Sequence, residues 1–301
     1  MVISKRMAKK TKPSKKVLKP RPLSDEGERR MNFNQAQKRE GTKRYHEWLN
    51  PSSLTGQPMP EQLQTFTEDP NWRIFRIMAE FIEGYQFLDK FHGEVSIFGS
   101  ARAPETDPFY RAARTLGCML GKAGYTVITG GGPGIMEAAN RGAFEAGGES
   151  VGLDIELSTE QRRNQYVTRA VGFHYFFTRK VMLSAAAQAY VFMPGGFGTL
   201  DEMTEMVTLV QTGKIPRDVP IILFGKKFWR PFIAWVRDVV LKKEKYIKKD
   251  DLALLHVVDT PKQAFDIIHK THERPYGSKQ NLMPTPPKVQ MVKKKKKSVS
   301  R

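Results

Sequence analysis

The chain of 301 residues has very little cysteine, and its single thiol, Cys118, excludes an internal disulfide framework and any metal site built from several cysteines. The sequence also lacks a run of about 18 apolar residues, which a membrane-spanning helix requires. No apolar segment follows the cations near the N-terminus, so we expect neither a secretory signal nor a membrane partner. These absences favour a reduced, cytoplasmic location.

Acidic residues are scarce relative to basic ones, with 31 Asp and Glu against 50 Lys and Arg and a net charge of +19. Residues 1–50 carry a net charge of +10 and residues 270–301 carry +9, whereas residues 51–269 hold 25 basic and 25 acidic side chains. The excess charge therefore belongs to the two ends of the chain. We expect those ends to make at most non-specific contacts with nucleic acid.

Four segments of the chain differ in composition. Residues 1–50 and 275–301 combine prolines and many lysines with no apolar periodicity, which predicts two disordered basic arms. Residues 51–92 contain a linker and then apolar residues at helical spacing, which predicts a helix at 71–90. Residues 93–274 remain as the segment that we expect to form the folded domain.

Short apolar runs alternate with helical patterns from residue 94 onward. We expect strands at 94–99, 125–129, 150–155, 189–193, 220–224 and 254–258, and helices at 108–122, 134–146, 175–187, 199–212, 228–244 and 261–273. Continuous apolar runs fit parallel strands that are covered on both faces. The order predicts an α/β fold, a doubly wound, Rossmann-like parallel sheet with helices on both faces.

Two glycine-rich turns follow expected strands and open expected helices. The first turn contains Gly131, Gly132 and Gly134, and the second contains Gly195, Gly196, Gly198 and Thr199. Glycines let a ligand approach the backbone, and the N–H groups at a helix start attract an anion. Neither turn matches the dinucleotide fingerprint or the ATP-binding P-loop. Two tight structural turns remain an alternative, but their matched placement favours a ligand that carries a phosphate.

Charged and polar side chains lie close to these turns in the sequence. Glu202 fits either a capping box with Thr199 or a catalytic carboxylate at the mouth of the sheet. Arg179 and Lys180 oppose the dipole of their helix, which favours pairing with Glu202 or a phosphate over a solvated face. Ser100 follows the first expected strand and reaches the same edge. The six histidines are scattered and show no metal-binding spacing.

The segment 194–202, PGGFGTLDE, resembles the PGGxGTxxE signature of the LONELY GUY family, which are cytokinin-activating phosphoribohydrolases. The Arg179-Lys180 pair, the glycine run 130–134 and the FGSAR segment at 98–102 are also similar to that family. The resemblance covers about residues 70–245, and the helix at 71–90 is similar to the longer bacterial-type branch.

This resemblance implies hydrolysis of the N-glycosidic bond of a nucleoside 5′-monophosphate, of the AMP or cytokinin riboside type, to free base and ribose 5-phosphate. It also implies a homodimer without a metal or another cofactor. The family's catalytic residues fall on Arg179 and Glu202. Its substrate contacts fall on the 195–199 loop, Lys180, Glu160, Asn164 and Thr208. Family members are often labelled lysine decarboxylases, but no pattern here indicates a pyridoxal phosphate site.

Three other functions remain open at this point. The first is a nucleotide sensor that binds in the same pocket without catalysis, which tight binding without release of base would reveal. The second is a nucleic-acid-associated protein that works through its basic ends, which deletion of those ends would reveal. The third is a redox enzyme that binds a dinucleotide, which the broken fingerprint disfavours.

Overall fold

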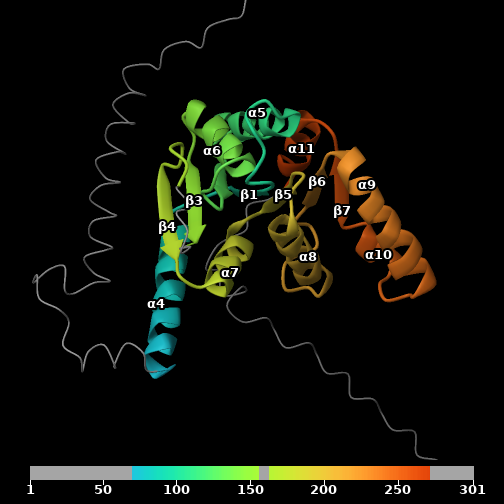
Figure 1. The fold of residues 1–301 in the computed structure, drawn as a ribbon, viewed down its shortest axis with the longest axis horizontal. Helices are drawn as coiled ribbons and strands as arrows, with labels where there is room; N and C mark the ends of the chain where they lie inside the picture. The colour runs from blue at the N-terminus through green and yellow to red at the C-terminus, as the bar shows by residue number, and fades with distance from the viewer. Residues whose placement is uncertain (1–69, 156–162, 272–301) are drawn as a thin grey trace, which may run out of the picture. The chain divides into compact units, whose positions relative to one another are not determined.

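A computed structural model describes residues 70–155 and 163–271 of the chain (Figure 1). All of these residues belong to the compact unit Thr65–Arg301. The basic ends 1–50 and 275–301, the linker 51–69 and Glu160 lie outside the described residues, so the predictions made for them stay predictions.

Seven parallel strands form one sheet in the order β4-β3-β2-β1-β5-β6-β7. Their bounds are β1 Glu94–Phe98, β2 Thr126–Thr129, β3 Ser150–Ile155, β4 Arg169–Phe173, β5 Ala189–Phe192, β6 Ile221–Phe224 and β7 Leu255–Val258. Every neighbouring pair is parallel, and in the central pair Phe98 lies opposite Phe192 with ring centroids 4.9 Å apart. The predicted parallel α/β sheet is confirmed, and β4 is an additional strand at its edge.

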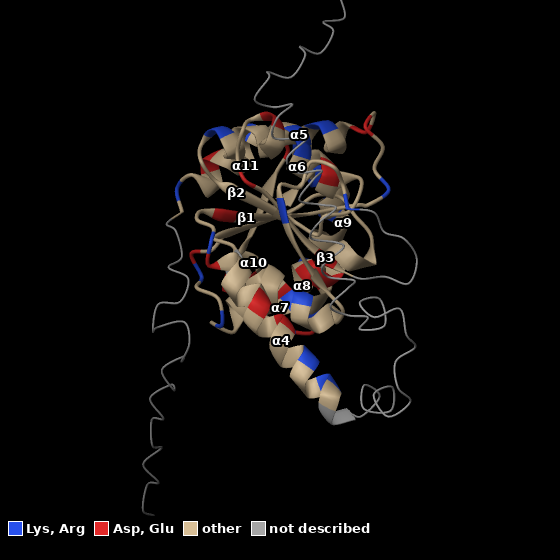
Figure 2. Ribbon diagram, turned by 90° about the vertical axis from the view of Figure 1, so that its left-hand side faces the viewer, with Lys and Arg blue, Asp and Glu red and all other residues tan. Residues whose placement is uncertain are grey.

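Helices cover both faces of this sheet. Their bounds are α4 Pro70–Leu88, α5 Pro108–Lys122, α6 Ile135–Glu145, α7 Phe176–Ala186, α8 Phe197–Gln211, α9 Lys226–Trp235, the π-helical η1 Val236–Lys243, α10 Lys249–Leu252 and α11 Pro261–Ile268. The buried side chains of α5, α6 and α11 fill one core, and those of α4, α7, α8 and α9 fill the other. Figures 1 and 2 show these two layers on opposite sides of the strands.

Besides the expected helix at 261–273, which ends at Ile268 as α11, two expected helices differ from those observed. The expected helix at 228–244 is divided into α9 and the π-helical η1, and Pro231 lies inside α9, where it supplies no N–H for the helical ladder. The expected helix at 199–212 begins earlier, at Phe197, and its N-cap is Gly196. This second difference changes the environment of Glu202, as described below.

The order of the strands places a switch point between β1 and β5. The chain builds outward from β1 through β2 and β3 to β4, and then returns to place β5 on the other side of β1. The helices that follow, α5 and α8, therefore pack on opposite faces. Ligands of such sheets bind in the crevice at the carboxyl ends of these strands. None of the described helices has the length and hydropathy needed to cross a membrane.

Candidate active site

Three turns meet at the carboxyl ends of β1, β2 and β5, and Ser100 joins them. The backbone N–H of Ser100 donates to the carbonyl of Pro194 at 3.0 Å, and its own carbonyl accepts from the N–H of Ile135 at 3.0 Å. Its hydroxyl accepts from the N–H of Arg102 at 3.1 Å. The structure therefore brings Ser100 and both glycine turns together, as the sequence predicts.

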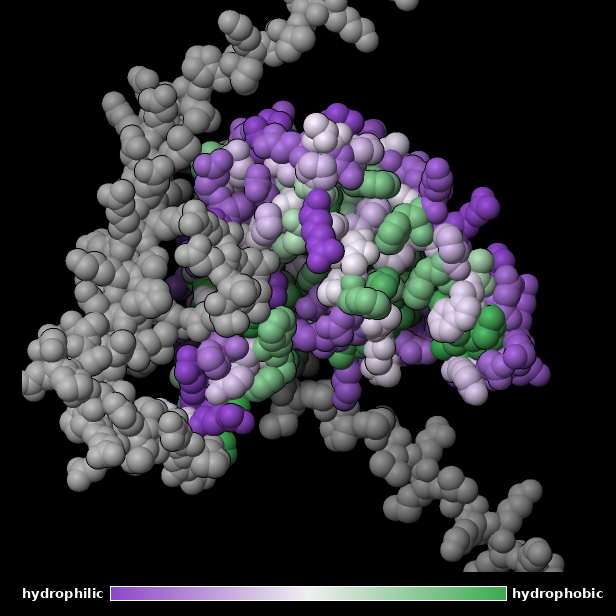
Figure 3. All heavy atoms as spheres, in the orientation of Figure 1, coloured by the Kyte–Doolittle hydropathy of each residue, from purple (hydrophilic) through white to green (hydrophobic). Residues whose placement is uncertain are grey.

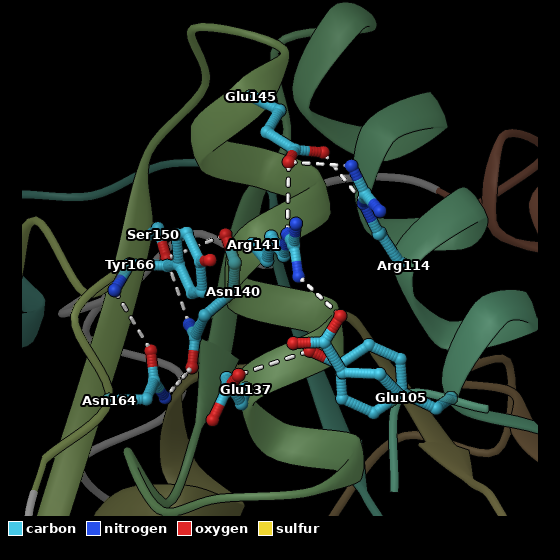
Figure 4. A network of polar contacts seen from close by, with 10 residues as sticks. Glu105, Arg114, Glu137, Asn140, Arg141, Glu145, Ser150, Asn164 and Tyr166 are labelled. Atoms are coloured by element: carbon cyan, nitrogen blue, oxygen red, sulfur yellow. Dashed lines mark hydrogen bonds and ion pairs between the residues drawn. The ribbon is translucent and has the colours of Figure 1, made fainter. Parts of the chain in front are cut away.

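The first glycine turn rests on a buried network of amide side chains (Figure 4). The Asn164 amide donates to the carbonyls of Gly131 and Gly132 at 3.1 and 3.0 Å, and to Oδ1 of Asn140 at 3.0 Å. Asn140 Oδ1 also accepts from the hydroxyl of Thr129 at 2.6 Å. These bonds satisfy the polar atoms under the turn, so its path is fixed from below.

The glycines of this turn make room for other parts of the protein. A Cβ atom on Gly130 would overlap the guanidinium of Arg179, and a Cβ atom on Gly131 would overlap the carboxylate of Asp154. Gly134 has a φ of +69°, and a Cβ atom there would overlap the backbone carbonyl of Ser100. The missing side chains therefore allow close internal packing at all three positions.

The second glycine turn is open on its outer side. Gly196 and Gly198 are exposed, and a Cβ atom built on either would meet no other atom within 4 Å. Gly196 is the N-cap of α8, and no side chain supplies a capping hydrogen bond there. The N–H groups of the first helical turn have no helical acceptor, so they are available to an anion.

The capping box expected for Thr199 and Glu202 is absent. Because α8 begins at Phe197, Thr199 is the third helical residue and Glu202 the sixth, whereas the box joins the N-cap to the third residue. Thr199 is buried instead, with its hydroxyl against Gly195, where a Cβ atom would overlap it. The carboxylate of Glu202 is thus not used to close the helix end.

Glu202 carries a buried carboxylate oxygen, Oε2, that has no hydrogen-bond partner among the described residues. Burial raises the pKa of Glu202 to about 7; Lys180 and Arg179 oppose this rise, and Glu205 and Asp201 add to it. A buried acceptor without a partner destabilises a fold, which makes it a candidate for contact with a ligand or water.

Arg179 lies between two carboxylates, Glu202 and Asp154. Its Nε atom donates to the carbonyl of Leu153 at 2.8 Å, and Asp154 in turn accepts from Arg163. Burial lowers the pKa of Arg179, and the two carboxylates oppose that effect. The guanidinium is therefore anchored through its Nε atom at the inner wall of the site, and it lies against Gly130 of the first glycine turn.

Lys180 lies over the start of α8 and binds acidic side chains there. Its Nζ atom is 2.8 Å from Oδ2 of Asp201 and 3.0 Å from Oε2 of Glu205. Burial alone would lower the pKa of Lys180, but these two bonds raise it above its ordinary value. Glu202 interacts with Lys180 and Arg179 only through longer-range electrostatic attraction. No hydrogen bond joins Glu202 to either side chain in the described part of the chain.

Glu80 of α4 fixes the start of α7, a role that no local sequence pattern indicates. Its carboxylate accepts from the N–H of His174 at 3.0 Å and from the hydroxyl of Thr178 at 2.6 Å. The residue that caps α7, Tyr175, forms no side-chain cap of its own. An anion at this end also offsets the dipole that Arg179 and Lys180 oppose. The contact joins residues more than 90 positions apart, so local spacing could not reveal it.

Two of the predicted substrate contacts, Thr208 and Asn164, form hydrogen bonds within the protein. Thr208 is on α8, about 9 Å along the helix axis from Glu202, and its hydroxyl donates to the carbonyl of Thr204. Asn164 is buried, and its amide supports the first glycine turn instead of facing an open space. Within the described residues, no group of three or more His, Cys, Asp or Glu side chains is arranged to hold a metal.

Comparisons with known proteins find relatives of this part of the chain. A family profile described as "Possible lysine decarboxylase" matches residues 136–268, a range that contains Arg179, the second glycine turn and Glu202. The cytokinin riboside 5′-monophosphate phosphoribohydrolase LOG of Oryza sativa subsp. japonica is 26% identical over 185 residues, which are 52% of this chain and 74% of that protein.

Two further proteins are similar over part of the chain. The cytokinin riboside 5′-monophosphate phosphoribohydrolase of Rhodococcoides fascians is 22% identical over 151 residues, which are 49% of this chain and 76% of that protein. The X-ray structure of TM1055 is 29% identical, with a TM-score of 0.46 over 58% of this chain and 98% of its own.

Proposed function

We propose that the chain belongs to the LONELY GUY family and hydrolyses the N-glycosidic bond of a nucleoside 5′-monophosphate to free base and ribose 5-phosphate. One observation carries the proposal: the buried, unpartnered oxygen of Glu202 stands at the switch point, next to a glycine turn that is open to solvent. The names of the relatives from rice and Rhodococcoides support the same class of reaction.

The open glycine turn would hold the 5′-phosphate. Its exposed backbone and the free N–H groups of the first turn of α8 suit an anion without any cationic side chain. Binding energy from the phosphate would then position the ribose, which is the part of the substrate that reacts. Gly196 and Gly198 would serve in this role because a side chain at either position would occupy the phosphate's place.

Glu202 would act on the ribose. Breaking the N-glycosidic bond leaves an oxocarbenium-like sugar, which an ionised carboxylate stabilises, by analogy with glycoside hydrolysis. The bonding electron pair leaves with the base, which takes up a proton. Water adds to C1′ and gives a proton to Glu202. Arg179 would keep Glu202 ionised and Lys180 would hold the acidic start of α8, so the two cations limit the rise of the pKa of Glu202.

A panel of nucleoside monophosphates, with release of base followed by chromatography, tests this function. We expect turnover of at least one member, and a fall of about 10²–10⁴-fold in kcat for Glu202→Gln. Arg179→Ala should also lose turnover, whereas Asp218→Asn, which changes an exposed carboxylate, should not. Wild-type turnover in both site variants would contradict the assignment. Tight binding of AMP by calorimetry without release of any base would favour the nucleotide sensor.

The protein would act as a homodimer in the cytoplasm. Several large apolar side chains of α4 and the start of α7 are exposed, among them Phe75, Met78, Ile82 and Phe176. Exposed apolar surface of this kind marks a protein interface, and a second copy would cover it. Light scattering coupled to gel filtration measures the mass directly, and a monomeric mass would contradict the dimer.

A further inference from the structure

Residues 51–269 are neutral as a whole, but their charge is unevenly distributed. Residues 226–249, which run from α9 through η1 to the start of α10, hold nine Lys and Arg against two acidic residues, a net charge of +7. The rest of residues 51–269 therefore carries a net charge of −7. The described residues outside this segment hold 16 basic and 18 acidic side chains, so the positive charge of the described structure is concentrated in this one segment.

Many of these cations have no acidic partner. Lys227, Arg230, Lys245, Lys248 and Lys249 are exposed, and the described residues supply none of them with an ion pair. The remaining cations of the segment do bind acids, for example Lys242, which is 3.1 Å from Asp238. A row of cations without partners raises the local potential and suits an anionic partner.

Three aromatic side chains stand exposed among these cations. Phe228, Trp235 and Tyr246 are 42%, 55% and 78% exposed. A chain of ring contacts links Phe228 to Trp235 through the buried Trp229 and through Phe232, with centroids 5.0, 6.1 and 6.4 Å apart. Figure 3 shows hydrophilic and hydrophobic side chains intermixed over α9 and η1.

The backbone brings the third ring to the same surface. The N–H of Tyr246 donates to the carbonyl of Val240 at 2.9 Å, so the chain after η1 folds back against the end of that helix. Tyr246 and Lys245 therefore lie beside η1, which follows Trp235 directly. The basic aromatic surface, as we name residues 226–249, is a continuous part of the fold.

We propose that the basic aromatic surface binds single-stranded nucleic acid. Exposed lysines and arginines neutralise the phosphates, and separate exposed rings stack on unpaired bases, which is how proteins bind single strands without reading sequence. The apolar face of α9 is turned inward, since Trp229 is buried and Ile233 packs on the core. Three exposed rings that are surrounded by charged side chains offer too little apolar area for insertion into a membrane. This inference does not depend on the proposed hydrolysis.

Fluorescence anisotropy with a labelled single-stranded RNA of about 20 nucleotides tests the surface in the full chain. The basic ends of the chain also attract nucleic acid, so titrations are made at about 0.2 M salt, where purely electrostatic binding is weakened. We expect Lys227→Glu with Arg230→Glu, and separately Phe228→Ala with Trp235→Ala, to weaken binding by about tenfold each.

The controls separate stacking from charge. Lys122→Glu with Arg111→Glu makes the same change of charge on α5, on the other face of the sheet, and should weaken binding by less than about threefold. A duplex of the same length should compete poorly, because its bases are already stacked. Equal losses in the α5 control, unchanged binding in the ring variant, or equal competition by duplex would overturn the proposal. So would binding to vesicles of anionic lipid that the ring variant abolishes while binding of RNA stays unchanged.

Discussion

The two glycine turns look alike in the sequence and differ in the structure. In the first, the places of the missing side chains are taken by Arg179, Asp154 and the backbone of Ser100, and a buried amide supports the turn from below. In the second, Gly196 and Gly198 border open space. Glycine therefore serves internal packing at these positions of the first turn and at Gly195, whereas at Gly196 and Gly198 it gives access to the backbone. The first turn builds the wall of the site, and the second presents the surface that a ligand can reach.

A pair of alanine substitutions tests this difference most strongly. Gly134→Ala forces a side chain onto a residue with a φ of +69° and against the carbonyl of Ser100. We expect a loss of about 2–4 kcal/mol in the free energy of unfolding, measured by denaturant titration. Gly198→Ala lies in the first turn of α8 and meets nothing, so it should leave stability unchanged or raise it by about 1 kcal/mol.

Gly198→Ala, which should keep its stability, should instead lose affinity for the nucleotide. The new methyl group of Gly198→Ala projects into the place proposed for the phosphate, so KM for the nucleotide should rise in a variant that is fully folded. The difference between the turns would be wrong if Gly198→Ala unfolded as readily as Gly134→Ala. It would also be wrong if Gly198→Ala bound nucleotide as the wild type does.

The support beneath the first turn gives the next largest effect. Asn164→Ala removes the side-chain donor to the carbonyls of Gly131 and Gly132; the Gly131 carbonyl keeps its bond from the backbone N–H of Asn164 at 2.8 Å, whereas the buried Gly132 carbonyl loses the bond from Asn164. We expect a loss of about 2–3 kcal/mol in stability and faster hydrogen exchange at residues 130–135. Thr204→Ala is a matched control, because its hydroxyl bonds are exposed. Equal losses in the two variants would show that Asn164 has no special role in the turn.

Much of the fold was predictable because its signals are local. The apolar runs of six strands, the glycine turns and the helical spacing of α4 each lie within a short stretch of sequence. Strand β4 was missed because Arg169–Phe173 is a short edge strand with a glycine and an exposed arginine, so it has no continuous apolar run. The helical spacing of α4 predicted the helix correctly, but it gave no sign that Phe75 and Ile82 would remain exposed.

The site was predictable only in part, for a similar reason. Arg179 and Glu202 were found because they accompany recognisable motifs, and the structure brings them within each other's field. The contacts of Glu80 with the start of α7, and of Asn164 with the first glycine turn, join distant parts of the chain. Thr199 and Glu202 have the spacing of a capping box, but they do not form one because the helix begins two residues earlier than expected. Motifs therefore identified the reactive groups, and the structure was needed to identify what holds them.

Leaving the carboxylate of Glu202 without a partner costs folding stability, and this cost depends on pH. Its pKa rises to about 7 in the folded protein from an ordinary 4.5, so the folded state binds the proton more tightly than the unfolded state does. The resulting stabilisation is fully present below about pH 4.5 and is lost as the pH rises through about 7. Glu202→Gln does not titrate. Relative to the wild type, it should therefore gain about 1–3 kcal/mol in stability between pH 5 and pH 8.

Thermal unfolding of both proteins at pH 5 and pH 8 measures this gain, and Asp218→Asn is the control for a carboxylate that is exposed. The first glycine turn has no comparable cost, because the polar atoms beneath it are bonded to one another. A gain in stability in Glu202→Gln and not in Asp218→Asn would show that keeping the carboxylate of Glu202 unpartnered on the open side of the site lowers the stability of the wild type. A difference that does not change with pH would instead mean that Glu202 is solvated in the free protein, and the two turns would then differ in access alone.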